Sequence, residues 1–368
     1  MTPAAARAND ASARARSVGE LAIWGFAFGY FAAYVPYSAL TKALSKGLIA
    51  GVKVSDFQLL PVSVLASVIG MFVFISMMRW WKYAGRRTVG GIEIPCPNRW
   101  TFLSGIATAA VIATTTLAYT FQGISIVFAM LLMRGGVLIL APIVDAIARR
   151  HVRWFSWMGL VLSIASLFVA FSDRAGYTLT LLAGIDIGIY LASYFVRLRF
   201  MSRLAKSPDP AANVRYFVEE QMIASPLLLI LLGAGALWGG DTLGESLRYG
   251  FTALWDSPVI WHIILVGIFS QGTGIFGGLV LLQKQENTFC VPVNRCSSVL
   301  AGVCASYALT IFLAQAPPNG RELLGAGIII AAILFLTIPT FVQKRSAARR
   351  RPAIAGEPLA EGRVGSNT

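Results

Sequence analysis

The sequence predicts an all-α membrane protein with ten transmembrane helices, arranged as two inverted five-helix repeats. Three observations lead to this fold class: an apolar composition, ten separate hydrophobic segments, and similar segments that recur in the two halves of the chain. Of the 368 residues, 56% are hydrophobic and 13% are charged, about half the charged fraction of a typical soluble domain. Because each span needs about 20 apolar residues, this length leaves no room for a separate catalytic domain.

The hydrophobic segments follow one another with short polar connections, and each is about long enough to cross a bilayer. In chain order they cover residues 20–41, 57–78, 101–120, 123–147, 155–172, 178–197, 214–239, 259–282, 287–313 and 322–342. Residues 1–19 are rich in Ala and Arg and predict a disordered cytoplasmic tail, without the apolar stretch of a cleavable signal peptide. Residues 343–368 predict a basic cytoplasmic tail.

Lysine and arginine residues are unevenly divided between the two sides of the predicted membrane. With both termini cytoplasmic, 23 of the 31 fall on the cytoplasmic side and 6 on the opposite side. This bias predicts an N-in, C-in topology and explains the net charge of +14 without a nucleic-acid partner. The connection 240–258 is long enough for a short interfacial helix.

Two pairs of segments indicate an internal repeat. Residues 130–139 match residues 291–300 at an offset of 161, which superposes an arginine within each segment. Residues 37–47 match residues 194–204 at an offset of 157, which superposes a tyrosine and two basic residues. Both matches occur in the same order and at nearly equal offsets.

The matches predict a first repeat over 20–172 and a second over 178–342. Each half holds five predicted spans, and an odd number requires the second half to be inverted relative to the first. Inverted repeats are common in secondary transporters, where the substrate binds near the bilayer midplane between the halves.

Arg134 and Arg295, which the repeat superposes, fall inside hydrophobic segments. A charge at the bilayer centre costs about 2.5–3.5 kcal/mol, so both positions need an explanation. In one interpretation both side chains face an aqueous cavity and clamp an anionic group, because guanidinium matches carboxylate and phosphate geometry. In another, an internal acid such as Asp186, Glu219 or Glu220 neutralises each arginine; a gate or counter-ion role is the third.

Polar residues flank both arginines at helical spacing. Tyrosines on the first and sixth segments predict the walls of a cavity, with a helix–helix seam or interfacial anchoring as alternatives. The predicted substrate-binding residues are Arg134, Arg295, Asn294, Ser298, Tyr34, Tyr37, Tyr190 and Tyr194. The residues predicted for proton coupling or gating are Asp186, Glu219, Glu220, Lys42 and Arg199. For the two glutamates, a solvated position at the headgroup boundary or a helix cap is the alternative.

Metal and cofactor chemistry have little support in the sequence. The four cysteines form no CxxC pair, and there are two histidines. We therefore expect no metal, no cofactor and no enzymatic activity.

These features resemble the drug/metabolite transporter superfamily over residues 20–342, since ten spans, inverted halves and cytoplasmic termini are typical of it. The nucleotide-sugar and triose-phosphate translocator branch is most similar. Its ninth helix carries a polar–basic pair that contacts substrate phosphates, and Asn294–Arg295 resembles that pair. Arg134 resembles the basic residue of its fourth helix. Residues 217–220 align with its Phe-Tyr-Asn-Asn motif, but two acids replace the two amides.

The resemblance implies a secondary transporter, an exchanger of a small organic anion such as a nucleotide sugar or a phosphorylated metabolite. A proton-coupled EamA-type exporter of a neutral or amphipathic metabolite is the first alternative. A polytopic membrane protein that transports nothing is the second. The expected partners are the lipid bilayer and the anionic substrate. A homodimer is one option for the oligomeric state, and a bacterial plasma membrane is the expected location.

Overall fold

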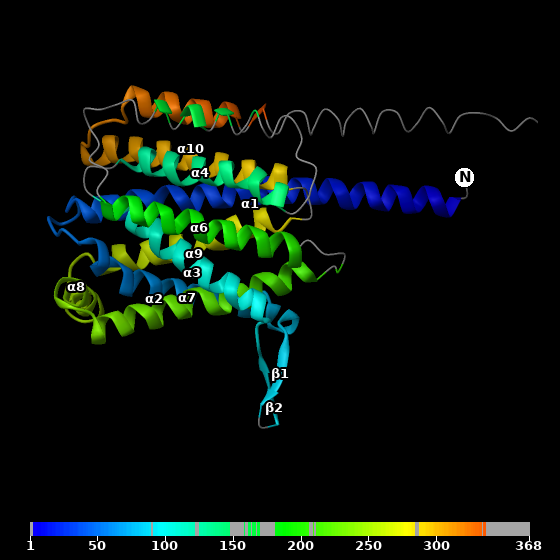
Figure 1. Cartoon of the computed structure of the whole chain (residues 1–368), viewed down its shortest axis with the longest axis horizontal. Helices are drawn as coiled ribbons and strands as arrows, with labels where there is room; N and C mark the ends of the chain where they lie inside the picture. The colour runs from blue at the N-terminus through cyan, green and yellow to red at the C-terminus, as the bar shows by residue number, and fades with distance from the viewer. Residues whose placement is uncertain are drawn as a thin grey trace, which may run out of the picture.

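The structure, a computed structural model, is a bundle of long helices (Figure 1). It describes residues 3–89, 91–121, 125–147, 158, 161–162, 164–166, 168–169, 181–205, 209, 211–283, 287–332 and 334–335. The helices are α1 (Pro3–Ser45), α2 (Asp56–Met77), α3 (Arg99–Thr120), α4 (Ile126–Ile147), α6 (Leu181–Leu204), α7 (Ala212–Trp238), α8 (Asp241–Phe251), α9 (Ile260–Leu281) and α10 (Asn287–Leu313). The described residues of 158–169 and of 320–335 are helical too. The predicted tail 343–368 lies outside the described residues.

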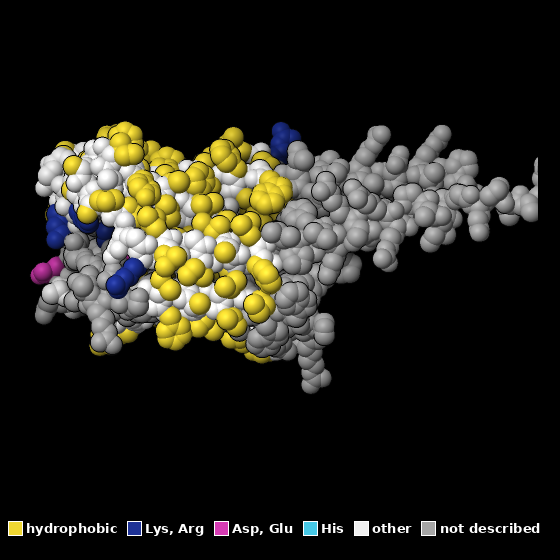
Figure 2. Space-filling model, turned by 90° about the horizontal axis from the view of Figure 1, so that it is seen from above, with side chains coloured by type: hydrophobic (Ala, Val, Ile, Leu, Met, Phe, Trp, Pro, Cys, Tyr) yellow, Lys and Arg dark blue, Asp and Glu magenta, His cyan; other side chains and the backbone are white. Residues whose placement is uncertain are grey.

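Six helices of the described chain are long and apolar enough to cross a membrane. They cover Phe57–Met77, Arg99–Thr120, Leu181–Leu204, Ala212–Trp238, Ile260–Leu281 and Cys290–Leu313. Large apolar side chains on these helices are exposed, as in Phe102, Leu231 and Phe312. Figure 2 shows apolar side chains across the middle of the visible face and Lys and Arg side chains towards its ends. The chain is therefore a helical, multi-pass membrane protein, as predicted; the count of ten spans stays a prediction.

The helices pack in a small set of close pairs. Helix α1 packs against α9 and α10, α3 packs against α6 and α7, and α4 packs against α10 and α6. Small residues allow some of these approaches. A Cβ atom on Gly267 would meet the carbonyl oxygen of Ser63 at 2.2 Å, so α2 and α9 are in backbone contact there.

Helix α1 is longer than the first hydrophobic segment. It begins at Pro3, so residues 3–19, expected to be a disordered tail, are helical. Alanine and arginine are among the best helix formers, and a helix already nucleated in the bundle extends easily into such a sequence. Figure 1 shows this part of α1 projecting beyond the end of the bundle.

The two ends of the bundle carry different small elements. A 3-10 turn (η1, Trp80–Tyr83) and a hairpin of strands β1 (Arg86–Val89) and β2 (Ile92–Pro95) connect α2 to α3. The strands pair antiparallel, with Arg86 opposite Pro95. At the other end lie α8, which confirms the helix predicted within 240–258, and the turn η2 (Ala253–Asp256).

Candidate functional site

The structure brings Arg134 of α4 and Arg295 of α10 to one tyrosine. Arg134 Nη1 donates a short hydrogen bond to the Tyr190 hydroxyl, and Arg295 Nη1 donates to the same oxygen at 3.3 Å. Two hydrogen bonds to one atom place their donor nitrogens no more than about 6 Å apart. The two arginines that the repeat superposes therefore meet in one place, between α4, α6 and α10.

Close helix packing makes this meeting geometrically possible. A Cβ atom on Gly136 would lie 2.6 Å from Leu191 Cδ2, so a larger residue there would require the Leu191 side chain to move. On the other side of the site, Asn294 Nδ2 donates to the Gly277 carbonyl at 3.3 Å and joins α10 to α9. A side chain at Gly277 would collide with Tyr30 of α1 at 2.8 Å.

Tyrosines form the immediate surroundings of both guanidinium groups. Arg134 Nη2 donates a short bond to the Tyr34 hydroxyl, which is also 2.9 Å from the Tyr119 hydroxyl. The Arg295 guanidinium lies over the Tyr194 ring, 4.7 Å from its centroid. Phenol oxygens and ring faces attract a guanidinium cation, but neither carries a formal charge to cancel it.

Neither arginine has an ionic partner in the part of the chain that the structure describes. Arg134 is 2% exposed and Arg295 is fully buried. The Nε atoms of both arginines and Nη2 of Arg295 are buried without a hydrogen-bond acceptor among the described residues. Buried charges are normally paired, and each unsatisfied donor adds a desolvation cost. The site thus offers three donor nitrogens without an acceptor and two uncompensated positive charges.

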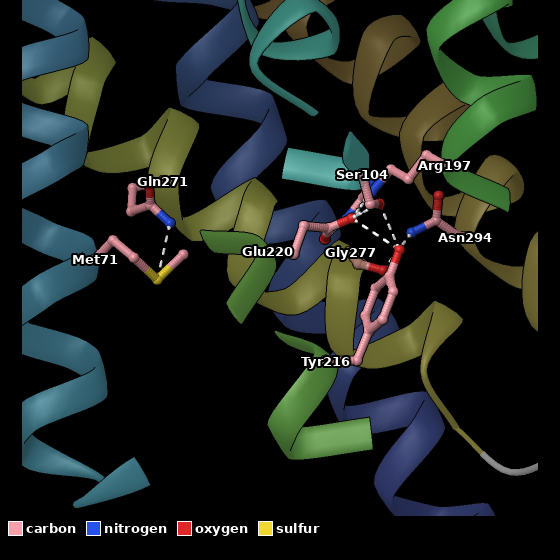
Figure 3. A network of polar contacts seen from close by, with 8 residues as sticks. All are labelled: Met71, Ser104, Arg197, Tyr216, Glu220, Gln271, Gly277 and Asn294. Carbon is pink, nitrogen blue, oxygen red and sulfur yellow. Dashed lines mark hydrogen bonds and ion pairs between the residues drawn. The ribbon is translucent and has the colours of Figure 1, made fainter. Parts of the chain in front are cut away.

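A third buried arginine beside the site is fully compensated, which makes the contrast informative. Arg197 of α6 holds Glu220 of α7 with two hydrogen bonds, Nε to Oε1 at 3.0 Å and Nη2 to Oε2 at 2.8 Å. Ser104 of α3 and Tyr216 donate to the same carboxylate at 2.7 and 3.1 Å. Figure 3 shows these four side chains converging from three helices. Glu220 is therefore committed to Arg197 and does not neutralise either central arginine.

Glu219 binds the root of the hairpin, where the chain enters β1 and leaves β2. Its carboxylate accepts hydrogen bonds from the backbone N–H of Gly85 at 3.0 Å and of Asn98 at 3.1 Å, and from the Thr101 hydroxyl at 2.7 Å. Glu219 is 3% exposed, so it is not the solvated headgroup residue considered as an alternative. This one carboxylate ties both ends of the hairpin connection to α7.

A cavity of about 70 Å³ lies beside Arg134, and Arg295 is not among the residues that line it. Its lining includes Arg134, Tyr34, Tyr194, Arg197 and Asn294. Sites for drug-sized ligands usually measure about 300–1,000 Å³, so this space suits a few water molecules or one small anionic group. A nucleotide sugar would need the helices to move apart.

The remaining predicted residues have other surroundings. Tyr37 lies against Tyr34 and shares a 2.8 Å hydrogen bond with Thr116. The Ser298 hydroxyl donates to the Arg295 carbonyl of its own helix at 2.9 Å. Asp186 is buried, and its Oδ2 has no partner among the described residues. It forms no ion pair with Arg134 or Arg295.

The two basic residues predicted for gating lie away from the central site. Lys42 Nζ donates to the Phe121 carbonyl at 2.9 Å and lines a second cavity of about 260 Å³ near Lys46 and Glu322. Arg199 is exposed on α6. Within the described chain, no group of three or more His, Cys, Asp or Glu residues could hold a metal ion.

Two residues of the site are not predicted from the sequence. Tyr30 and Tyr119 belong to the cluster, whereas Arg197 lies on the polar face of the sixth segment that the sequence predicts to line a cavity or a helix–helix seam. Helical spacing could have indicated Tyr30, one turn before Tyr34. No local signal pointed to Tyr119, which joins the cluster only through packing of α3 against α1.

Comparisons with known proteins show a similarity of fold and no similarity of sequence to a known family. No protein-family model matches it, and no curated protein matches it. Nineteen chains of known structure are similar to it. One of them, described only as "Crystal structure of protein", shows 12% sequence identity and a TM-score of 0.54, and the match covers 85% of this chain and 96% of that one. At such low identity the likeness concerns the fold alone.

Proposed function

We propose that this membrane protein is a secondary transporter, an exchanger of a small organic anion that works by alternating access. The observation that carries the proposal is the pair of buried arginines, Arg134 and Arg295, with three unpaired donor nitrogens and no carboxylate partner among the described residues. A phosphate or carboxylate group would supply the missing acceptors and the missing negative charge. Nucleotide sugars and phosphorylated metabolites are the substrate class that the family resemblance favours.

The binding step follows from the geometry of the shared tyrosine. Tyr190 accepts hydrogen bonds from both arginines, and the bond from Arg295 is long for a charged donor. An entering oxyanion would take over this position and the free Nε and Nη2 donors of Arg295.

The helix packing supports the inverted repeat. If α1 exchanges with α6, α2 with α7, α3 with α9 and α4 with α10, the observed pair α1–α9 becomes α6–α3, and α1–α10 becomes α6–α4. The pair α2–α9 becomes α7–α3. All of these pairs are in contact, and α4–α10 and α2–α7, which map onto themselves, are in contact as well. Such an exchange of partners is what two related halves around one axis would produce.

Alternating access gives the Arg197–Glu220 cluster a role. It joins α3, α6 and α7 beside the cavity and close to the hairpin, because the adjacent Glu219 binds the backbone of Gly85. A cavity of about 70 Å³ next to this ion pair fits a state that is closed around the anion site. Transport would require α3, α6 and α7 to separate on the side of the hairpin. On the opposite side, the ends of α1, α4 and α10 would have to separate.

The proposal can be tested with purified protein in two stages. A thermal-unfolding screen against sugar phosphates, nucleotide sugars, dicarboxylates and amino acids would identify anions that stabilise it. Counterflow of the best anion in proteoliposomes would then compare wild type with Arg295→Gln, and with Arg199→Gln, an exposed arginine of α6, as the matched control. We expect counterflow to disappear in Arg295→Gln alone. Undiminished counterflow in that variant would reject the anion site.

One observation, the buried carboxylate of Asp186, favours proton-coupled export as a second candidate function. Both glutamates considered for proton coupling are engaged in hydrogen bonds, Glu219 with backbone amides and Glu220 with Arg197. Asp186, by contrast, is buried with a free Oδ2 among the described residues. If this alternative holds, Asp186→Asn will abolish transport driven by a proton gradient, whereas Arg295→Gln will preserve it.

A further inference from the structure

The connection between α2 and α3 carries a dense group of exposed basic side chains, with one exposed and three half-buried aromatic side chains among them. We call it the hairpin surface, and it consists of Arg79, Trp80, Trp81, Lys82, Tyr83, Arg86, Arg87, Ile94, Arg99 and Trp100. Arg79, Lys82, Arg86, Arg87 and Arg99 are all exposed. Transport by the central site uses none of these residues, so the surface needs its own explanation.

The charge of the hairpin surface is largely uncompensated. Arg86 forms an exposed ion pair with Glu93 at 2.8 Å. In the described part of the chain, no carboxylate lies within ion-pair distance of Arg79, Lys82 or Arg87. The surface therefore attracts anions, and because it is exposed this attraction depends on ionic strength.

The position of the hairpin relative to the helices indicates what kind of anion it meets. Figure 1 shows β1 and β2 projecting sideways from the bundle, near one end of the helices. Because the helices cross the membrane, a hairpin in this direction lies along the membrane surface. The membrane-spanning helix α3 begins at Arg99, directly after the hairpin. The hairpin therefore lies at the depth of the lipid headgroups.

The side chains around the hairpin suit that depth. Trp100 is 37% exposed, and the Arg99 guanidinium lies 4.8 Å from its ring centroid. Lys82 lies 5.0 Å from the ring centroid of Tyr83. Tryptophan and tyrosine concentrate at membrane–water interfaces, and basic side chains near them reach the phosphate groups. Ile94, opposite Arg87 in the register and 46% exposed, adds an apolar contact on the same face.

The hairpin is held rigidly enough to act as a platform. Glu219 binds the backbone N–H groups of Gly85 and Asn98, which stand at its two ends. A Cβ atom on Gly85 would lie 2.9 Å from the Cys96 carbonyl oxygen and 3.0 Å from Glu219 Oε1, so the two chains are close at this root. A fixed root keeps the basic side chains in one orientation to the membrane.

We propose that the hairpin surface binds the phosphate groups of anionic lipids and fixes this end of the bundle at the membrane surface. The occupant is a lipid and not a soluble anion, because apolar and aromatic side chains stand among the charges. This proposal is independent of the transported substrate.

Hydrogen–deuterium exchange in nanodiscs tests the proposal on the intact protein. The exchange of amides in residues 86–95 would be compared in phosphatidylcholine nanodiscs with and without phosphatidylglycerol. Each basic residue near an anionic surface contributes about fivefold in affinity, so we expect at least about fivefold slower exchange with phosphatidylglycerol. The difference should shrink in high salt. Equal exchange in the two lipid mixtures would overturn the proposal.

Two further experiments identify the residues involved and test whether the phosphate comes from a lipid or from solution. Lys82→Gln/Arg87→Gln should abolish the effect of phosphatidylglycerol, whereas Lys46→Gln/Lys53→Gln, which removes two exposed lysines from the opposite end, should preserve it. Persistence of the lipid effect in the first variant would contradict the assignment. Inorganic phosphate added to pure phosphatidylcholine nanodiscs should leave exchange unchanged. If it slows exchange equally, the surface binds free phosphate and the lipid proposal is wrong.

Discussion

Two buried arginines of this protein should respond in opposite ways to the same substitution. Arg197→Met removes one partner of a buried ion pair and leaves the fully buried Glu220 carboxylate without its cation. Breaking such a pair from one side costs about 3–5 kcal/mol. Arg295→Met removes a charge that has no ionic partner among the described residues.

The cost of Arg295→Met can be worked out from its contacts. The lost interactions are one 3.3 Å hydrogen bond to Tyr190, about 1.5 kcal/mol, and one cation–π contact with Tyr194, about 1 kcal/mol. The gain is relief of the charge itself, about 3 kcal/mol at the middle of a membrane. We therefore expect the free energy of unfolding to stay within about 1 kcal/mol of wild type or to rise.

Unfolding in mixed detergent micelles with increasing dodecyl sulfate, followed by tryptophan fluorescence, would measure both variants. The expected gap between them is about 3–5 kcal/mol in favour of Arg295→Met. Arg199→Met, an exposed arginine on the same helix as Arg197, is the matched control and should change little. A loss in Arg295→Met as large as in Arg197→Met would refute the reasoning, because it would show that Arg295 is a structural residue with a partner of its own.

Three further substitutions test other parts of the structure. Gly136→Val should displace the Leu191 side chain and lower stability by about 1–3 kcal/mol in thermal unfolding, whereas Gly184→Val, with open space around it, should not. Glu219→Ala should expose both ends of the hairpin and speed hydrogen exchange there by about tenfold or more, since each freed N–H loses a charged acceptor. Tyr190→Phe should destabilise the anion-free protein yet enlarge the stabilisation by a saturating anion, because the anion then replaces no internal acceptor; an unchanged thermal shift would contradict this.

The helices and the two central arginines were within reach of sequence analysis because each leaves a local signal. Apolar segments of membrane-spanning length predict the helices, and a charge inside such a segment is rare enough to stand out. The repeat then predicted that Arg134 and Arg295 belong together, and the structure places both on Tyr190. The helical residues 3–19 were missed because small and basic residues favour both helix and disorder until the neighbouring bundle decides.

The partners of the buried acids were beyond sequence analysis for a geometric reason. Glu219 and Glu220 are neighbours in sequence, but successive residues of a helix point about 100° apart. Glu219 therefore reaches the hairpin root, and Glu220 reaches Arg197. This assignment depends on the rotation of α7 about its axis relative to α3 and α6. The hairpin itself carried a signal, the Gly-Gly pair between two short alternating stretches. The two dominant hydrophobic segments on either side outweigh this short signal.

The charge balance of the bundle centre links the fold to the proposed function. Arg134, Arg295 and Arg197 bring three positive charges to the centre, and among the described residues Glu220 is the one carboxylate paired with any of them. Mutual repulsion between Arg134 and Arg295 grows as water leaves the site, because charges a few ångströms apart interact more strongly in a low dielectric. A protein that only needed to hold its helices together would be more stable with apolar residues at both positions. The retained charges are therefore best explained by a partner that enters and leaves, and an anion with two negative charges would balance the site most completely.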